Sequence, residues 1–308
     1  MADLPSQAHP TPRAPRIDPA ALARHLQHAT RRDAPWLHQE IARRMADRLS
    51  LVRRQPARVI DWWSPTGGSA ELLAAQYPEA RLLRFDCHDQ PMPEPPRTDS
   101  VPRWWQRLTG TSGRTIEPVA GPQTAELLWA NMMLHWVDDL PTLMARWHAA
   151  LAVDGFLMFS CFGPDTLREL HALYAALGWG APGSPWIDMH DLGDELVHAG
   201  FADPVMDMER LTLTWDTPQA LLAELRLLGR NTASARQPGL RSRDWRIKLD
   251  TLLTQHLTGA DGRLHLSFEV IYGHAFRPVA RARVQAQTEI SLDAMREMTR
   301  QRNPGRID

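Results

Sequence analysis

Two acids flank a short turn of small residues, and this spacing is the part of the sequence best suited to bind a nucleotide. Asp61 lies in an apolar run, the turn 64–68 is Ser-Pro-Thr-Gly-Gly, and Asp86 follows a second apolar run. An apolar 3.6-residue period over 70–77 predicts a helix between the two runs. The start of such a helix presents backbone N–H groups and a positive dipole end to a ligand. An acid about 20 residues beyond the turn can hold both hydroxyls of a ribose.

The turn lacks the glycines of the common dinucleotide-binding motif. G-x-G-x-x-G is absent, so the sequence does not support a nicotinamide or flavin site. The stretch approaches the pattern V-L-D-x-G-x-G-x-G, but Trp63 and Pro65 replace two of its glycines. Glycine allows close ligand approach or a positive φ, and tryptophan and proline restrict both. Two hypotheses stay open: a working nucleotide pocket, or a nucleotide fold whose pocket is altered or lost.

The elements that would position these residues alternate between strand and helix. Strands are predicted over 57–62, 80–85, 115–119, 125–132, 156–162, 204–215 and 263–276. Helices are predicted over 36–49, 70–77, 139–151, 164–177 and 188–199. Such alternation is typical of an α/β fold, a parallel sheet with helices on both faces. In the helix 36–49 we expect one buried face, made by Trp36, Leu37, Ile41, Met45 and Leu49.

Composition divides the chain into one domain and two appendages. Residues 1–18 are rich in proline and alanine, and we expect them to be disordered. Residues 19–280 form the predicted domain, with a helical insert over about 217–259 between the last two strands. Residues 281–308 form a polar tail.

Charge, hydropathy and cysteine content exclude several classes of protein. The chain has 308 residues, 43% of them apolar, which is enough for one α/β domain. A net charge of −1 argues against general affinity for nucleic acid or membranes. No apolar run has the length of a membrane span, and the first residues lack the apolar core of a signal peptide. Cys87 and Cys161 have no metal-type spacing, so we expect a cytoplasmic protein without a metal site or disulfide framework.

Three later segments carry a family resemblance. They are ANMMLHWVDDLP at 130–141, FSCFGPDTLREL at 159–170 and FEVIYGHAFRP at 268–278. These resemble the patterns S-N-x-x-L-Q-W-x-x-D, F-S-T-x-G-x-x-T-L-x-E-L and Y-E-V-x-Y-x-H-A-W-x-P of the malonyl-[acyl-carrier protein] O-methyltransferases of biotin synthesis. That family belongs to the class I methyltransferases that use S-adenosylmethionine. The resemblance covers about 36–278, and it departs from the family at Trp63, at Pro65 and in a segment 20–28 without tyrosine.

The resemblance implies a Rossmann-like sheet of seven strands with a reversed last strand and a helical lid insert before it. It also implies S-adenosylmethionine at the carboxyl ends of the first, second and fourth strands. The residues that it assigns to the cofactor site are Asp61, Trp63, Ser64, Thr66, Gly67, Asp86, Asn131 and Met132. Within this set the turn residues would line the methionine end, Asp86 would hold the ribose, and Asn131 with Met132 would lie beneath the transferring methyl group. The alternatives are an Asn131 that only caps a strand and an Asp86 that is a solvated acid.

A free carboxylate on a malonyl thioester would be an anionic acceptor that needs no general base. Arginine binds carboxylate bidentately, and the predicted insert is rich in cations. Over residues 226–248 of the insert, the single acid Asp244 stands against Arg226, Arg230, Arg236, Arg241, Arg243, Arg246 and Lys248. We predict Arg226, Tyr272 and His274 as catalytic candidates, and an acidic acyl carrier protein as the partner of the remaining cations. A solvated helical face, a half-buried tyrosine and a strand-end histidine are the alternatives.

The leading hypothesis is a methyltransferase dependent on S-adenosylmethionine that esterifies malonyl carrier protein. The main alternative is a methyltransferase-like protein with a degenerate cofactor site that acts as a binding or assembly factor. A third hypothesis is an arginine hydroxylase, an activity found among relatives of this fold. The position of the Trp63 indole distinguishes the first two, because an indole in the methionine space would close the cofactor site.

Overall fold

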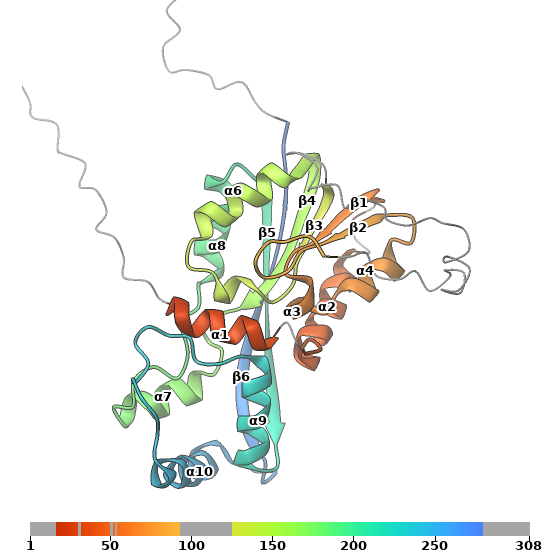
Figure 1. Ribbon diagram of the computed structural model, residues 1–308. Coiled ribbons are helices and arrows are strands. Elements are labelled where there is room, and N and C mark those ends of the chain that lie inside the picture. The colour runs from red at the N-terminus through yellow and green to blue at the C-terminus, as the bar shows by residue number, and fades with distance from the viewer. Residues whose placement is uncertain (1–16, 30–31, 50–51, 53, 93–124, 280–308) are drawn as a thin grey trace, which may run out of the picture. The chain divides into compact units, whose positions relative to one another are not determined.

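Figure 1 shows the computed structural model, which describes residues 17–29, 32–49, 52, 54–92 and 125–279. The described residues up to Pro278 belong to one compact unit, and Val279 to a second. Six strands of the first unit form one sheet, in the order β2-β1-β3-β4-β6-β5. They are β1 (Arg58–Asp61), β2 (Arg81–Arg84), β3 (Ala125–Ala130), β4 (Leu151–Phe162), β5 (Ala202–Trp215) and β6 (Leu264–Phe276).

The sheet is parallel except for its reversed last strand. Strand β1 pairs in parallel with β2 and β3, and β3 pairs in parallel with β4. Strand β6 runs antiparallel to both of its neighbours, β4 and β5. The predicted α/β class and the reversed last strand are therefore confirmed. The strand predicted over 115–119 lies outside the described residues, which contain six strands of the sheet.

Helices cover both faces of this sheet. They are α1 (Pro19–Ala29), α2 (Trp36–Leu49), α3 (Ser64–Gly67), α4 (Ala70–Gln76), η1 (Leu134–Trp136), α6 (Leu140–Ala150), α7 (Arg168–Ala176), α8 (Met189–His198), α9 (Pro218–Leu228) and α10 (Arg243–Leu257). The core on one face is built with α2, α4, α7, α9 and α10, and the core on the other with η1, α6 and α8 (Figure 1). Alternate strand residues point to opposite cores. No helix of the described part is long and apolar enough to cross a membrane.

Several helices begin at a side-chain cap that the sequence supplies. The caps of α6, α8, α9 and α10 are Asp139, Asp188, Thr217 and Ser242, and each accepts a hydrogen bond from a backbone N–H of the first turn. Two expectations need correction. Helix α7 begins at Arg168 rather than near Pro164, because the preceding residues form turns. Trp36 is 49% exposed at the start of α2, so the buried face begins at Leu37.

Strand β6 extends well beyond the carboxyl end of β4. The last residue of β4, Phe162, pairs with Val270, so residues 264–269 continue past it and pair with β5 alone. Helices α7 and α10 pack against β6, and α9 packs against β5. In the chain, α9 and α10 lie between β5 and β6. Because they pack on the extended part of these two strands, they lie beyond the carboxyl ends of the parallel strands (Figure 1).

Glu269 joins the second and third family-like segments. Its carbonyl oxygen accepts from the N–H of Gly163 at 2.9 Å and from Thr166 Oγ1 at 2.9 Å. Its carboxylate accepts from the N–H of Asp165 at 2.7 Å. A Cβ at Gly163 would lie 2.8 Å from the Glu269 carboxyl carbon, so the close approach requires glycine there. This contact fixes the loop that follows β4.

A pair of glycine substitutions tests the packing of the sheet. A Cβ at Gly273 in β6 would overlap the ring of Phe159 in β4, whereas a Cβ at Gly193 inside α8 would meet only Met206 Cγ at 3.7 Å. We expect Gly273→Ala to lower the free energy of unfolding by about 1–3 kcal/mol through overpacking. We expect Gly193→Ala to raise it by about 0.5–1 kcal/mol, because alanine favours a helix. Urea denaturation measures both, and equal stabilities of the two variants would contradict this packing.

Candidate functional site

Asn131 is the buried centre of the candidate site, directly after β3. Its Nδ2 donates to the carbonyl oxygens of His38 at 2.8 Å and Gly67 at 2.7 Å, and its Oδ1 accepts from Ser160 Oγ at 2.6 Å. His38 Nδ1 lies 2.8 Å from the carbonyl oxygen of Thr66 and donates to it. One amide thus joins β3, β4, α2 and α3. Asn131 does more than cap a strand, but the protein already uses both of its amide hydrogens.

The turn between β1 and α4 offers fewer donors than its sequence predicts. The four backbone N–H groups of 64–68 all donate to carbonyl oxygens of the protein, namely those of Phe85, Trp63 and Ser64. The hydroxyl of Ser64 accepts from Arg84 Nε at 2.9 Å, and that of Thr66 donates to the carbonyl of Trp63 at 2.8 Å. The protein itself therefore uses the N–H groups of 64–68, and the expected N–H groups at the start of the helix 70–77 stay a prediction. Serine, threonine and glycine serve here to fold the turn tightly.

Trp63 adopts the backbone conformation for which a glycine is usual. Its φ of 55° and ψ of 43° lie in the left-handed region, at an intrinsic cost of about 1–2 kcal/mol for a residue with a Cβ. Only 7% of Trp63 is exposed; its ring stacks on that of Trp136 at 6.4 Å, and its Nε1 donates to Asp89 Oδ1 at 3.1 Å. Met132 is also left-handed, with φ 53°, and buried. Packing and one hydrogen bond hold the Trp63 indole against Trp136.

Asp61 is a fully buried carboxylate at the carboxyl end of β1. Neither of its oxygens has a hydrogen-bond partner among the described residues. Burial raises the pKa of Asp61 to about 7, and nearby Ser64 and Arg84 act in the opposite direction. Ser64 and Arg84 offset only part of the cost of burying this carboxylate, so a cationic group that entered here would be bound favourably.

Asp86 follows β2 and has one engaged and one unengaged oxygen. Its Oδ1 accepts from the N–H groups of His88 and Gln90, both at 2.8 Å, and so folds the loop after the strand. Among the described residues, no hydrogen bond reaches Oδ2. Asp86 thus stabilises its own loop and keeps an acceptor that could take a hydroxyl of a ligand.

The three predicted catalytic residues are not brought together. Arg226 is exposed on α9. The hydroxyl of Tyr272 donates to Glu209 Oε2 at 3.1 Å, and the Arg48 guanidinium lies 3.8 Å from the centre of the tyrosine ring. His274 pairs in register with Met158, well inside the sheet. The expected position of Tyr272 and His274 beside the insert is therefore corrected, because α9 and α10 pack near the other end of β6.

A group of histidines that the sequence analysis did not single out lies at the carboxyl ends of the strands. This histidine cluster is His25 from α1, His38 from α2 and His135 from η1. The rings of His38 and His135 are 6.3 Å apart, and Trp136 lies 4.6 Å from His25 and 4.4 Å from His135. The three histidines come from separate parts of the chain, so no spacing reveals them. The one sequence signal is His135, which stands where the family pattern has glutamine.

All three histidines are held neutral by burial. Burial lowers the pKa values of His25 and His38 to about 4 and that of His135 well below its usual range. Both ring nitrogens of His135 and the Nε2 atoms of the other two have no hydrogen-bond partner in the described part of the chain. The described residues form no group of three or more His, Cys, Asp or Glu that could hold a metal ion. The cluster therefore offers neutral donors and acceptors.

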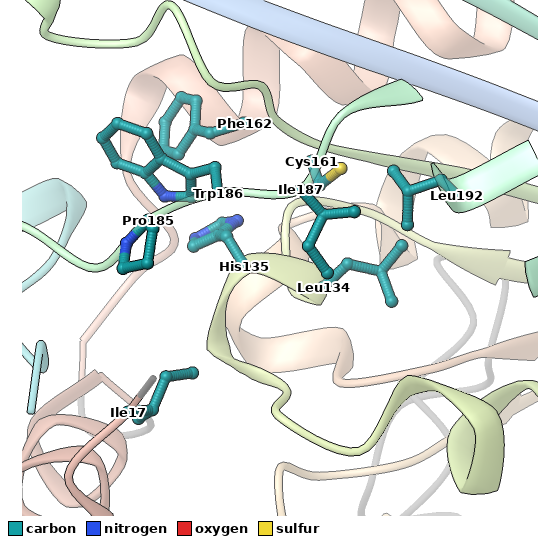
Figure 2. Close-up of a pocket in the computed structure, with 9 residues that line it drawn as sticks. All are labelled: Ile17, Leu134, His135, Cys161, Phe162, Pro185, Trp186, Ile187 and Leu192. Carbon is teal, nitrogen blue, oxygen red and sulfur yellow. The ribbon is translucent and has the colours of Figure 1, made fainter. Parts of the chain in front are cut away.

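A cavity lies beside His135 (Figure 2). It holds about 280 Å³ of empty space, counting the space that is open to solvent. Its lining is mostly apolar and consists of Ile17, Leu134, His135, Cys161, Phe162, Pro185, Trp186, Ile187 and Leu192. These residues come from η1, from the carboxyl end of β4, from the segment just before α1, and from α8 and the segment leading into it.

The start of α1 is tied down over this cavity. The N–H of Ile17 donates to Asp138 Oδ2 at 3.3 Å, and the N–H of Asp18 donates to the carbonyl oxygen of Thr232 at 2.8 Å. The Asp18 carboxylate caps α1 and forms an ion pair with Arg236, which lowers the pKa of Asp18. The chain between α9 and α10 therefore fastens α1 in place.

The sequence matches no family model, but it is similar to proteins named malonyl-[acyl-carrier protein] O-methyltransferase. That of Laribacter hongkongensis is 39% identical over 83% of this chain and 87% of the relative. That of Gallionella capsiferriformans is 37% identical over 80% of this chain and 85% of the relative. That of Nitrosospira multiformis is 35% identical over 85% of this chain and 91% of the relative. Among solved structures, the YcgJ protein of Bacillus subtilis covers 77% of this chain and 98% of its own at 10% identity, with a TM-score of 0.44.

Asp61→Asn tests the buried carboxylate. The folded pKa of about 7 is raised above the ordinary value, so the native state takes up a proton that the unfolded state lacks. Stability from this group is therefore present at low pH and is lost as the pH rises to about 7, with a total of about 4 kcal/mol. Asparagine cannot ionise. We expect the ligand-free variant to match the wild type only near pH 3–4, and its advantage in urea denaturation to grow by about 2–3 kcal/mol between pH 5 and pH 8. Parallel pH profiles would contradict the assignment.

A double-mutant cycle tests the tie between α1 and the insert. We expect Asp18→Asn and Arg236→Gln each to raise hydrogen exchange in residues 19–29 by about two- to fivefold, because each removes the same ion pair. The double variant should exchange no faster than the faster single variant. Arg246→Gln, which removes an ion pair within α10, is the matched control. Additive effects, or unchanged exchange in 19–29, would show that this ion pair does not hold α1.

Proposed function

The chain belongs to the family of malonyl-[acyl-carrier protein] O-methyltransferases, and we propose that it methylates the free carboxylate of a malonyl thioester on an acyl carrier protein. The methyl donor is S-adenosylmethionine, and the ester product serves biotin synthesis. The observation that carries this proposal is the 39% identity over 83% of the chain, since the match spans 87% of the relative. It thus covers most of a whole enzyme rather than its nucleotide half.

Two acids at the strand ends fit the polar groups of the donor. The buried, unpartnered carboxylate of Asp61 would hold its α-ammonium group. The free Oδ2 of Asp86 would accept from a ribose hydroxyl. The turn 64–68 fits less well, because its N–H groups are already used by the protein. Binding would therefore depend on the acids and on the aromatic walls near Trp63.

When bound, the donor supplies a methyl group on a positively charged sulfur. Transfer forms an oxygen–carbon bond to the acceptor and breaks the sulfur–carbon bond, so the products are a methyl ester and S-adenosylhomocysteine. The acceptor carboxylate is already an anion, so no residue has to remove a proton. The protein contributes alignment and the exclusion of water, for which the buried rings of Trp63 and Trp136 are suited.

The surface of α9, α10 and the chain between them would receive the carrier protein. Arg226, Arg230 and Arg243 are exposed and form no ion pair with any described residue. Leu240 and Ile247 are exposed apolar side chains on the same segment. Cations beside apolar groups favour an acidic partner with an apolar patch.

A second candidate, a binding or assembly factor without transferase activity, is favoured by one observation. The turn has no free N–H groups, and a tryptophan takes the glycine position. In that case the fold and the docking surface would be retained while the donor no longer binds.

Calorimetric titration with S-adenosylhomocysteine separates the two candidates. We expect micromolar binding by the wild type and a loss of at least about tenfold in Asp86→Ala, because a hydrogen bond to a charged acceptor is removed. Glu79→Ala, an exposed acid before β2, should bind like the wild type. Methyl transfer to malonyl carrier protein should follow the same order. A folded wild type that does not bind would overturn the transferase and support the second candidate.

A further inference from the structure

The cavity beside His135 lies where an acceptor would have to enter. Helix η1, which carries His135, follows Asn131 and Met132 at the carboxyl end of β3. Cys161 and Phe162 close the cavity from the end of β4. The proposed donor site occupies the neighbouring strand ends, β1 to β3. A group in the cavity would therefore be adjacent to that site.

His135 is the polar group in this otherwise apolar lining that can bind an anion. Burial raises the pKa of Cys161 to about 12, so its thiol stays neutral and is a weak donor. Figure 2 shows the His135 ring beside Pro185 and Trp186, within the lining of the cavity. Both of its nitrogens lack a partner among the described residues, and leaving a buried polar atom unpaired costs about 1–3 kcal/mol. A ligand with a hydrogen-bond acceptor would remove that cost.

We propose that this cavity binds the acyl end of the methyl acceptor and that a ring N–H of His135 positions the reacting carboxylate. This inference rests on the proposed function and names its acceptor subsite. It also replaces Arg226 as the orienting residue, since Arg226 is exposed on α9 and is not part of the cavity lining. The apolar walls, which include Leu134, Ile187 and Leu192, suit the short methylene segment of a malonyl group.

A neutral hydrogen-bond donor has a chemical advantage over a cation as the group that orients the acceptor carboxylate. A guanidinium would form a tight ion pair with the carboxylate and lower its nucleophilicity, whereas an imidazole N–H orients it with less withdrawal of charge. Burial is the main cause that lowers the pKa of His135, and the neighbouring imidazoles of His38 and His25 further disfavour an added proton there. Arg230, near His25, further disfavours an added proton on that ring. The sulfonium of the methyl donor would then supply a positive charge next to the acceptor carboxylate.

The proposal predicts a specific pattern among three variants, assayed as methyl transfer to malonyl carrier protein. His135→Leu removes the hydrogen-bond donor while keeping a side chain of similar volume, and we expect the KM for the carrier protein to rise about 10- to 100-fold. His135→Gln restores an N–H donor and should stay within about threefold of the wild type. His148→Leu removes a half-buried histidine from α6, away from the cavity, and should leave the KM unchanged. Affinity for S-adenosylhomocysteine should be equal in all of them.

Nitrogen NMR of the histidine side chains gives a readout that does not depend on turnover or on the folding of the leucine variant. With S-adenosylhomocysteine present, malonyl-pantetheine should shift one ring N–H signal, identified by its absence in His135→Gln. An unchanged KM in His135→Leu, a glutamine variant as impaired as leucine, or an unshifted His135 signal would each overturn the subsite while the transferase stands. A wild type that binds neither ligand would overturn the transferase and the subsite together.

Discussion

The amide of Asn131 is the contact on which the geometry of this edge of the sheet depends. It binds the carbonyl oxygens of His38 and Gly67 while accepting from Ser160. Because these three partners belong to α2, α3 and β4, the amide fixes these elements to the end of β3. A Cβ at Gly67 would lie 3.2 Å from the Asn131 carbonyl oxygen, so this close packing leaves little room for a larger residue. The small residues of the turn are explained by contact with the protein itself.

That contact also explains how a tryptophan can stand in the turn. The left-handed backbone of Trp63 is strained, but its ring packs on Trp136 and its Nε1 is bonded to Asp89. Rigid neighbours are required to hold such a conformation. Where the pattern V-L-D-x-G-x-G-x-G has glycines, this turn is closed and packed with aromatic side chains. The acids Asp61 and Asp86 remain at the strand ends, which is why a donor site is still compatible with this architecture.

Local sequence patterns predicted most of the fold, because strand and helix periodicity is a local property. The insert before the last strand also followed from the pattern along the chain, whereas the reversal of that strand came from the family resemblance and is confirmed by its antiparallel pairing. The site was predicted less well. The sequence predicted Tyr272 and His274 beside the insert because they stand near the end of a motif. Their pairing with Ser160 and Met158 of β4 instead places them inside the sheet. The histidine cluster escaped notice because α1, α2 and η1 meet only through tertiary packing.

The distribution of unpaired polar atoms indicates what this edge is built to do. Asp61, His25 and His38 are buried and His135 is partly buried with both ring nitrogens shielded from solvent. All four lack partners for some or all of their polar atoms among the described residues, and they lie near the carboxyl ends of the strands. By contrast, Ser69 and Trp129, deeper in the same core, satisfy each other at 2.8 Å. An unpaired buried group lowers stability, so natural proteins keep several together only where something else compensates. A cationic donor beside Asp61 and an anionic acceptor beside His135 would each provide the missing partner. Binding of such ligands would therefore stabilise this edge of the sheet.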